Sequence, residues 1–332
     1  MKQRIHYIDI AKGILILSLM YTHLYSANKI IGVNNDYFNI LYYFIPFIAC
    51  FFMQCFFMIS GYCSNFDNNF STFIKRQWRQ ILVPWICFEF ISKISSTIYW
   101  DTLSIENLYH QLITPPNTGL CFFSALFFSK LYLWITLQIT KKHSIIIYTS
   151  LVLLIIALYI NEYDIGQNIL AIRNSLAACF FVSFGFYLKG QKMLYKYLLK
   201  SGYIIFPTSL LILKLLHLKI PILDAGVSNV GLIYIPIILI LTISGSFTIL
   251  FISDHINKNK ILEYFGRNSI IIYGLHFLPL VMTINFYFDL INPQNIYSLI
   301  LTTILIYSTL AIILILIISI VNTKYLKWII GK

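Results

Sequence analysis

The sequence has few charged residues for its length. Asp, Glu, Lys and Arg make up 11% of the 332 residues, whereas 59% are hydrophobic. A soluble domain of this size cannot bury so large an apolar share. Charge is missing altogether from stretches such as 144–160 and 230–252, which have the length that a helix needs to cross a bilayer. The scarcity of charge therefore excludes an ordinary soluble fold and predicts several membrane spans.

The sequence also lacks the motifs of common soluble enzymes. It contains no Gly-rich phosphate loop, no Gly-x-Ser-x-Gly elbow and no repeat of fixed length. Its 6 cysteines show no metal-ligand spacing and are interpreted as small buried side chains, so we expect no metal site. The net charge of +12 would suit nucleic acid, but the basic residues form short clusters between apolar runs. We therefore expect no nucleic-acid partner.

Read as helices, the apolar runs predict ten spans. These cover residues 8–27, 38–63, 80–100, 118–140, 144–160, 168–188, 201–218, 230–252, 269–289 and 296–321. Most of the 24 Lys and Arg residues fall in alternate loops, which by the positive-inside rule places both termini in the cytoplasm. The predicted fold is all-α: a polytopic membrane helical bundle of about ten transmembrane helices, forming one domain over residues 1–332.

The first span carries two costly side chains, Lys12 and His23. Eleven helical residues turn through three full turns plus about 20° and rise by about 16 Å, so both side chains share one helix face. An ionisable group inside hydrocarbon is a functional-site candidate, and histidine can take up and return a proton near neutral pH. This pair predicts a cation near one membrane surface and a base near the middle of the bilayer.

Two arginines precede the third span. Arg76 and Arg79 are three residues apart and are therefore neighbours on a helix surface. Adjacent guanidinium groups at a membrane entrance suit a phosphate group. The alternative is that they only anchor a loop on the positive side of the membrane.

Further polar residues lie inside predicted spans. His276 follows a helix start at Asn268 or Ser269 and reaches a depth similar to that of His23; it either takes part in catalysis or bonds two helices together. Glu89 either orients a histidine or pairs with a lysine one turn further along. Arg173 and Asn174 either contact a substrate or line a wet cavity.

Several of these segments occur together in one known family. The chain resembles the acyltransferase-3 family of integral membrane acyltransferases, and within it the branch of fucose 4-O-acetylases, through YIDIAKGILILSLMYTH, FFMQCFFMISGY, RQWRQILVPW, GLCFFSALF and FGRNSIIIYGLH. Better-known members carry Arg where this chain has Lys12, which keeps the charge but loses the bidentate fork. They often show Trp where Cys121 precedes two phenylalanines here.

The resemblance implies an acyl transfer reaction. It implies acetyl-CoA or another acyl-CoA as a donor substrate taken from the cytoplasm, with no permanently bound cofactor, and an acceptor hydroxyl on a cell-surface glycan or its lipid-linked precursor. It also implies a multi-pass protein of the cytoplasmic (inner) membrane of a bacterium. We expect Lys12, Arg76 and Arg79 to hold the donor's phosphates.

The remaining candidates are assigned to catalysis and to the acceptor. His23 is expected to be the general base or, should an acyl-enzyme form, its carrier, with His276 as a second catalytic residue. Glu89, Arg173 and Asn174 are the expected substrate contacts. Two other functions compete: a transporter or flippase of lipid-linked sugars, which predicts internal repeats and paired broken helices, and a non-catalytic sensor or assembly subunit.

Overall fold

All regular structure in the described part of the chain is helical, which confirms the predicted all-α class. The structure is a computed structural model. It describes residues 5–31, 43–66, 69–100, 120–163, 165, 171–222, 232–256, 258–293 and 295–331, with the backbone alone for 25–31 and 95–100.

The helices follow one another along the chain with short connections. They are α1 (His6–Ile31), α3 (Ile45–Ala49), α4 (Phe52–Cys63), α5 (Phe70–Gln77), the π-helix η1 (Trp78–Leu82), α6 (Val83–Trp100), α8 (Cys121–Ile139), α9 (His143–Glu162), α10 (Ile172–Gly190), α11 (Lys192–Leu215), η3 (Leu232–Tyr234), α12 (Ile235–Ile256), α13 (Lys260–Arg267), α14 (Ser269–Leu275), α15 (Phe277–Ile291), α16 (Ile296–Val321) and η4 (Lys327–Ile330).

Seven helical segments in the described part are long and apolar enough to cross a membrane, and the pair α14 and α15, bent by 60°, makes an eighth. The other two predicted spans, 80–100 and 168–188, coincide with α6 and α10, which are helices of 18 and 19 residues. Arg173, Asn174 and Lys189 make α10 less apolar than the other helices. A multi-span membrane protein is thus supported, while the count of ten and the orientation of the termini stay predictions.

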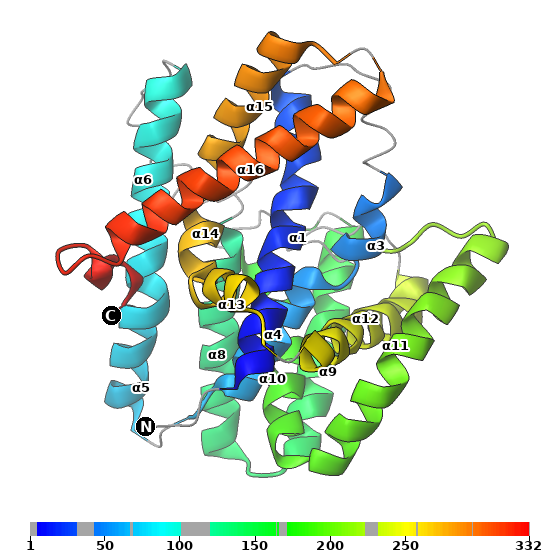
Figure 1. Ribbon diagram of the computed structural model, residues 1–332. Coiled ribbons are helices and arrows are strands. Elements are labelled where there is room, and N and C mark those ends of the chain that lie inside the picture. Colours follow the sequence, from blue (N-terminus) through cyan, green and yellow to red (C-terminus); the bar gives the residue numbers. More distant parts are fainter. Residues whose placement is uncertain are drawn as a thin grey trace.

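The helices share a common long axis, although α16 crosses the others obliquely (Figure 1). The chain begins at the same end of the molecule as the α8–α9 and α10–α11 connections, and we call this end the N-terminal side. Helix α10 packs against α4, α8 and α9, while α1 packs against α4, α12, α13 and α15. The α15–α16 connection lies at the opposite end (Figure 1).

Four glycines let neighbouring helices touch through their backbones. Gly61 of α4 and Gly185 of α10 each face a carbonyl of the other helix, and a Cβ at either position would collide with it. Gly13 of α1 and Gly266 of α13 form a second reciprocal pair of this kind. Small residues at such crossings are typical of membrane helix packing. They fix α1 and α4, which carry part of the site described below.

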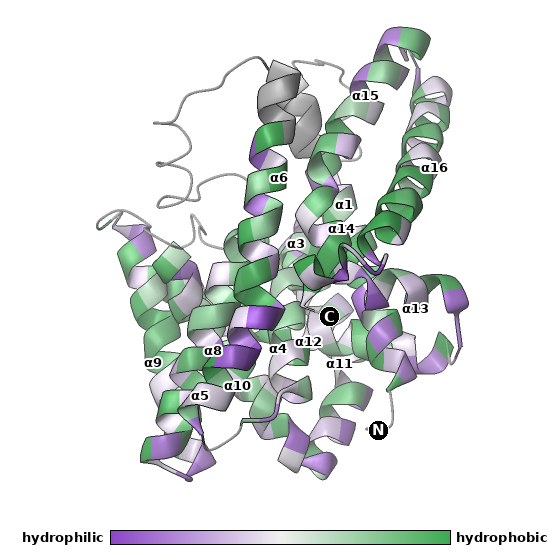
Figure 2. Cartoon of the chain, turned by 90° about the vertical axis from the view of Figure 1, so that its left-hand side faces the viewer, coloured by the Kyte–Doolittle hydropathy of each residue, from purple (hydrophilic) through white to green (hydrophobic). Residues whose placement is uncertain are grey.

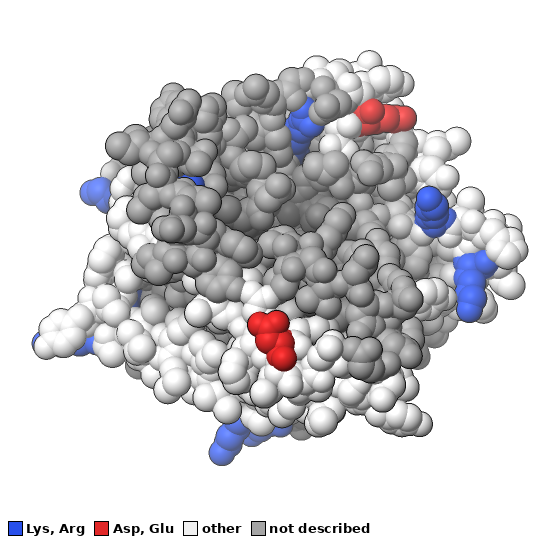
Figure 3. All heavy atoms as spheres, turned by 90° about the horizontal axis from the view of Figure 1, so that it is seen from above, with Lys and Arg blue, Asp and Glu red and all other residues white. Residues whose placement is uncertain are grey.

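The outer surfaces of the bundle are apolar. Large hydrophobic side chains are exposed along α9, α11 and α16, among them Tyr148, Leu211 and Ile312. Hydrophilic residues gather around α5, α13 and the helix ends of the N-terminal side (Figure 2). From the opposite end, the described Lys and Arg side chains appear only at the periphery (Figure 3). This distribution suits a bundle surrounded by lipid.

Candidate functional site

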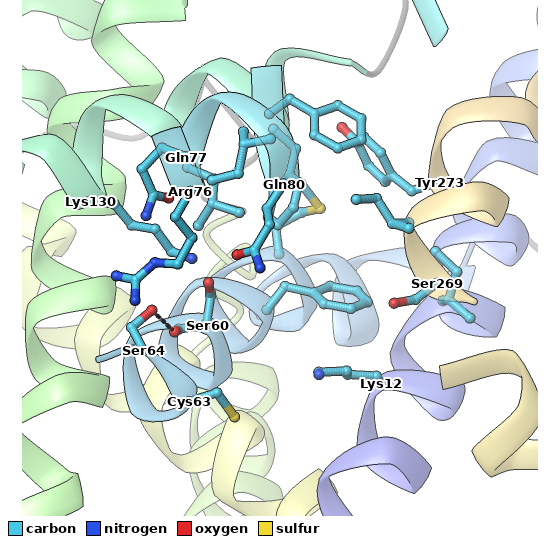
Figure 4. A pocket seen from close by; sticks show the side chains of 18 of the residues that line it. Lys12, Ser60, Cys63, Ser64, Arg76, Gln77, Gln80, Lys130, Ser269 and Tyr273 are labelled. Atoms are coloured by element: carbon cyan, nitrogen blue, oxygen red, sulfur yellow. Dashed lines mark hydrogen bonds between the residues drawn. The ribbon is translucent and has the colours of Figure 1, made fainter. Parts of the chain in front are cut away.

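A cavity of about 450 Å³ lies among α1, α4, α5, η1, α8 and α14. Its described lining includes three cationic side chains, Lys12, Arg76 and Lys130, and no Asp or Glu. Lys12 points into the cavity from one side, while Arg76 and Lys130 lie across from it (Figure 4). A volume of this size is ordinary for a small-molecule site. The cavity therefore favours an anionic ligand.

Two helices bring one face each to the cavity. On α1 that face holds Lys12 and Ile16, four residues apart, and on α8 it holds Phe122, Leu126 and Lys130 at the same spacing. Residues four apart lie above one another on a helix, so each helix presents one continuous stripe. On both stripes a cation is followed by apolar side chains. The cavity is therefore cationic at one end and aromatic or aliphatic at the other.

The third cation, Arg76, is held at the end of α5. Its guanidinium donates to the backbone carbonyl of Asn65, just after α4. Lys189, at the end of α10, donates to the carbonyl of Ser64 at 3.0 Å and to the side chain of Asn65. Two cations from different helices thus hold the same short segment. This arrangement connects α4, α5 and α10 at the mouth of the cavity.

A π-helical turn separates the two arginines that the sequence placed side by side. The turn, η1, continues α5 into α6, where Pro84 has no backbone N–H to offer the carbonyl of Gln80. Such looser turns often occur at functional sites. Gln80 lines the cavity, whereas Arg79 is exposed and does not. Arg76 and Arg79 therefore do not face the cavity together as a regular α-helix predicts.

The two predicted histidines meet in the structure. The ring centroids of His23 and His276 are 5.0 Å apart, with the planes at 84°. The ring of Phe277 packs against that of His23 at 5.7 Å. His276 is 3% exposed, and the Nδ1 atom of His23 is buried. Two residues more than 250 positions apart in the sequence thus form one compact group.

The tautomer of His276 follows from its contacts. Its Nδ1 atom lies 2.9 Å from the carbonyl oxygen of Ile272 and 3.1 Å from that of Tyr273. Carbonyls only accept hydrogen bonds, so Nδ1 carries the proton and Nε2 of the neutral ring carries the lone pair. Within the described residues neither this Nε2 nor Nδ1 of His23 has a hydrogen-bond partner. Two buried ring nitrogens are therefore available to a ligand.

A break in the ninth predicted span positions His276. Helices α14 and α15 meet at this residue at 60°. Pro279 lacks the N–H that the carbonyl of Leu275 would otherwise accept, which accounts for a sharp kink there. Gly274 packs closely on the ring of Phe88 from α6. The kink and this packing together direct His276 toward α1.

Neither histidine lines the cavity, but both lie close to its apolar end. Ile16 of the lining precedes His23 by seven residues, or about 10 Å along the helix. Tyr273 lines the cavity and also accepts the hydrogen bond from His276. Phe122 and Phe123 contact the Tyr273 ring at 5.2 and 5.3 Å. An aromatic wall thus stands between the cationic cavity and the histidine pair.

The remaining predicted residues lie outside this cavity's lining. Glu89 is buried in α6, where the indole N–H of Trp85 donates to it at 3.4 Å. Arg173 and Asn174 are buried at the start of α10, and Arg173 donates to the carbonyl of Ile165 at 2.9 Å. The structure therefore does not bring these three residues to the cations. Among described residues there is also no cluster of His, Cys, Asp and Glu suited to a metal.

The sequence analysis missed one cation of the cavity and one supporting ion pair. Lys130 was not singled out, although a lone lysine late in the apolar run of span four is itself a signal. The guanidinium of Arg267 lies 3.6 Å from the carboxylate of Asp9 and also contacts Glu263, tying α13 to α1 next to the Gly13 and Gly266 contact. No local pattern predicts that long-range pair.

Comparison with known families decides the class of the protein. The acyltransferase-3 family, described as an acyltransferase domain, matches residues 5–322. The chain belongs to this family. The resemblance inferred from the motifs is thereby confirmed at the level of the family, and the protein is a membrane acyltransferase. No curated protein and no solved structure matches the chain.

Proposed function

We propose that this acyltransferase moves an acyl group, most simply acetyl, from cytoplasmic acyl-CoA to a hydroxyl of a cell-surface glycan or its lipid-linked precursor. The observation that carries this proposal is the buried pair of His23 and His276, placed beyond the apolar end of a cationic cavity. Within the family's chemistry, a base next to a donor cavity is the arrangement that acyl transfer to a hydroxyl requires.

His23 is the proposed general base. As the acceptor oxygen attacks the thioester carbonyl, neutral His23 takes the hydroxyl proton; the C–S bond then breaks, the ester forms, and the proton passes to the leaving thiolate of coenzyme A. Such a base contributes typically about 10² to 10⁴ in rate. Burial of its Nδ1 atom among apolar side chains supports a neutral resting state.

The cavity is the proposed donor site. Coenzyme A has phosphates at one end and a thioester at the end of a thin arm, which corresponds to a cavity with Lys12 and Arg76 at one end and aromatic rings at the other. Arg79 lies outside the lining and is proposed only as an aqueous contact. The arm would cross the aromatic wall at Tyr273 to bring the thioester to the histidines.

The acceptor is proposed to reach the histidines from another direction. Glu89, Arg173 and Asn174, all outside the cavity, remain the proposed acceptor contacts. The proposed location is the cytoplasmic membrane of a bacterium, with both termini in the cytoplasm. The membership of the fucose 4-O-acetylase branch belongs to the same proposal, since it rests on Lys12 and the motifs alone.

A transporter of lipid-linked sugars is the second candidate. The observation that favours it is the 60° break between α14 and α15, because broken helices at mid-membrane are typical of transporter sites. A transporter of this type has such breaks in pairs, and only one bent pair occurs in the described part of the chain. The family membership also points to acyl transfer.

The His23→Gln variant tests the proposed function. Gln keeps a hydrogen-bonding group but cannot serve as a base, so purified His23→Gln should transfer acetyl from acetyl-CoA at least about 10²-fold more slowly than wild type. Mass spectrometry of the surface glycan, with and without the gene, gives the product. Equal elution of both proteins from size exclusion shows that folding is unaffected. A rate within a few-fold of wild type would remove His23 from the chemistry.

A further inference from the structure

Lys130 has no place in the reaction as described so far. It lies in α8, is half-buried, and lines the cavity. No ion pair or hydrogen bond of its ammonium group is present within the described residues. A lysine inside an apolar helix costs free energy unless something compensates its charge. Its position therefore calls for an anionic partner that enters the cavity.

The surroundings of Lys130 strengthen this requirement. Arg76 and Lys12 are close enough for their positive charges to act on it. The described lining contains no carboxylate that would offset them. Three cations from three separate helices thus surround one cavity and repel each other. An anion with several charged oxygens would turn this repulsion into attraction.

We propose that Lys130 completes an anion site with Lys12 and Arg76 and binds the phosphate groups of the acyl donor. This rests on the proposed function and names the group that holds the donor's charged end. The stripe on α8 favours a donor over other phosphates, because Leu126 and Phe122 continue from Lys130 along the wall that the apolar arm would follow. The diphosphate of a lipid-linked acceptor shares this chemistry, so the experiment separates the two.

The test compares two donors in the Lys130→Met variant. Methionine keeps the length and volume of the stem but removes the charge. A charged hydrogen bond is worth about 1.5 to 3 kcal/mol, so the KM for acetyl-CoA should rise about tenfold or more. S-acetylpantetheine lacks the adenosine phosphates, and its KM should change far less. Lys130→Arg should restore most of the affinity for acetyl-CoA.

Lys142→Met is the matched control. Lys142 is exposed at the α8–α9 connection, on the N-terminal side, and does not line the cavity. Its variant removes one positive charge from the same side of the molecule and should leave both KM values unchanged. An equal rise for acetyl-CoA in both variants would show a general charge effect and would overturn the role of Lys130.

Three further outcomes are decisive. Equal losses with both donors in Lys130→Met would assign Lys130 to packing and overturn the proposal. A raised KM for the lipid-linked acceptor, with that for acetyl-CoA unchanged, would assign the site to the acceptor and also overturn it. If wild-type protein transfers no acyl group, the proposed function fails, and equilibrium binding of adenosine 3′,5′-bisphosphate still tests the site: weaker binding to Lys130→Met supports it, and unchanged binding overturns it.

Discussion

The two ends of the site differ in charge, in exposure and in how they are built. The cavity end has three cations from α1, α5 and α8, each half-buried, around an open space. The histidine end has two aromatic bases from α1 and the α14–α15 break, packed against Phe277. Charge is affordable only where water or an anionic ligand reaches it, so the apolar end holds groups that are neutral at rest.

This difference separates binding from chemistry. Electrostatic attraction at the cavity end acts on the donor before and during the reaction alike, which affects KM more than kcat. A base at the apolar end acts on a proton that moves only in the transition state, which affects kcat. Variants at the two ends should therefore fall into two kinetic classes, and the experiments below test this division.

The largest expected effect is at the histidine end. In His276→Asn the side-chain amide can still donate to the carbonyls of Ile272 and Tyr273, but the position of Nε2 is lost. We expect kcat to fall about 10²-fold, within the usual range for a lost acid–base group, while the KM for acetyl-CoA changes less than about threefold. Steady-state kinetics of purified protein measures both.

The alternative for His276 is that it only bonds helices together. In that case His276→Asn, which keeps the hydrogen bonds, would retain near wild-type kcat, and His276→Ala would reduce the amount of folded protein instead. Thermal unfolding of the two variants, measured beside their activity, separates the roles. The division between the two ends fails if His276→Asn raises KM and leaves kcat alone.

The histidine pair shows what sequence can predict about this site. His23 and Lys12 share a face because helix periodicity fixes it, and one helix is a local object. His276 was predicted at a similar depth from the helix rise alone. That the two rings lie 5.0 Å apart depends on the kink at Pro279 and on the reciprocal contacts of Gly13 and Gly266, which join distant segments. No periodicity in the sequence encodes those contacts.

An intermediate effect is expected where the two arginines part company. Arg76→Ala should raise the KM for acetyl-CoA about tenfold, and more at low salt than at high salt, because contacts with phosphate are electrostatic. Arg79→Ala should raise it less than about twofold, because an exposed charge outside the cavity interacts weakly. Kinetics at two ionic strengths measures both. Equal effects would mean that the π-turn does not separate the two residues in the working enzyme.

The arginines also show where prediction from sequence fails. The spacing of Arg76 and Arg79 places them together only on a regular α-helix. The π-helical turn at Trp78–Leu82 changes the winding between them, and Pro84 alone does not announce it. Lys130 was missed for a different reason: it becomes part of the site only because α8 packs beside α1 and α5 around the same cavity. Helix neighbours, unlike helix faces, are not visible in a single sequence.

The smallest effect is expected for Lys12→Arg. Lys12 lies at the cationic end, on the stripe that leads to His23, and the commoner family residue at this position is arginine. Arginine keeps the charge and adds a bidentate fork, so the KM for acetyl-CoA should stay within about threefold of wild type or fall below it. Lys12→Met should raise KM several-fold, and Lys12→Glu more, because a carboxylate opposes the phosphates. In all three variants kcat should change little, which is the sharpest statement of the division, since Lys12 and His23 occupy one face of one helix. A kcat loss in Lys12→Arg comparable to that of His23→Gln would mean that the face works as a single catalytic unit rather than as a binding end and a chemical end.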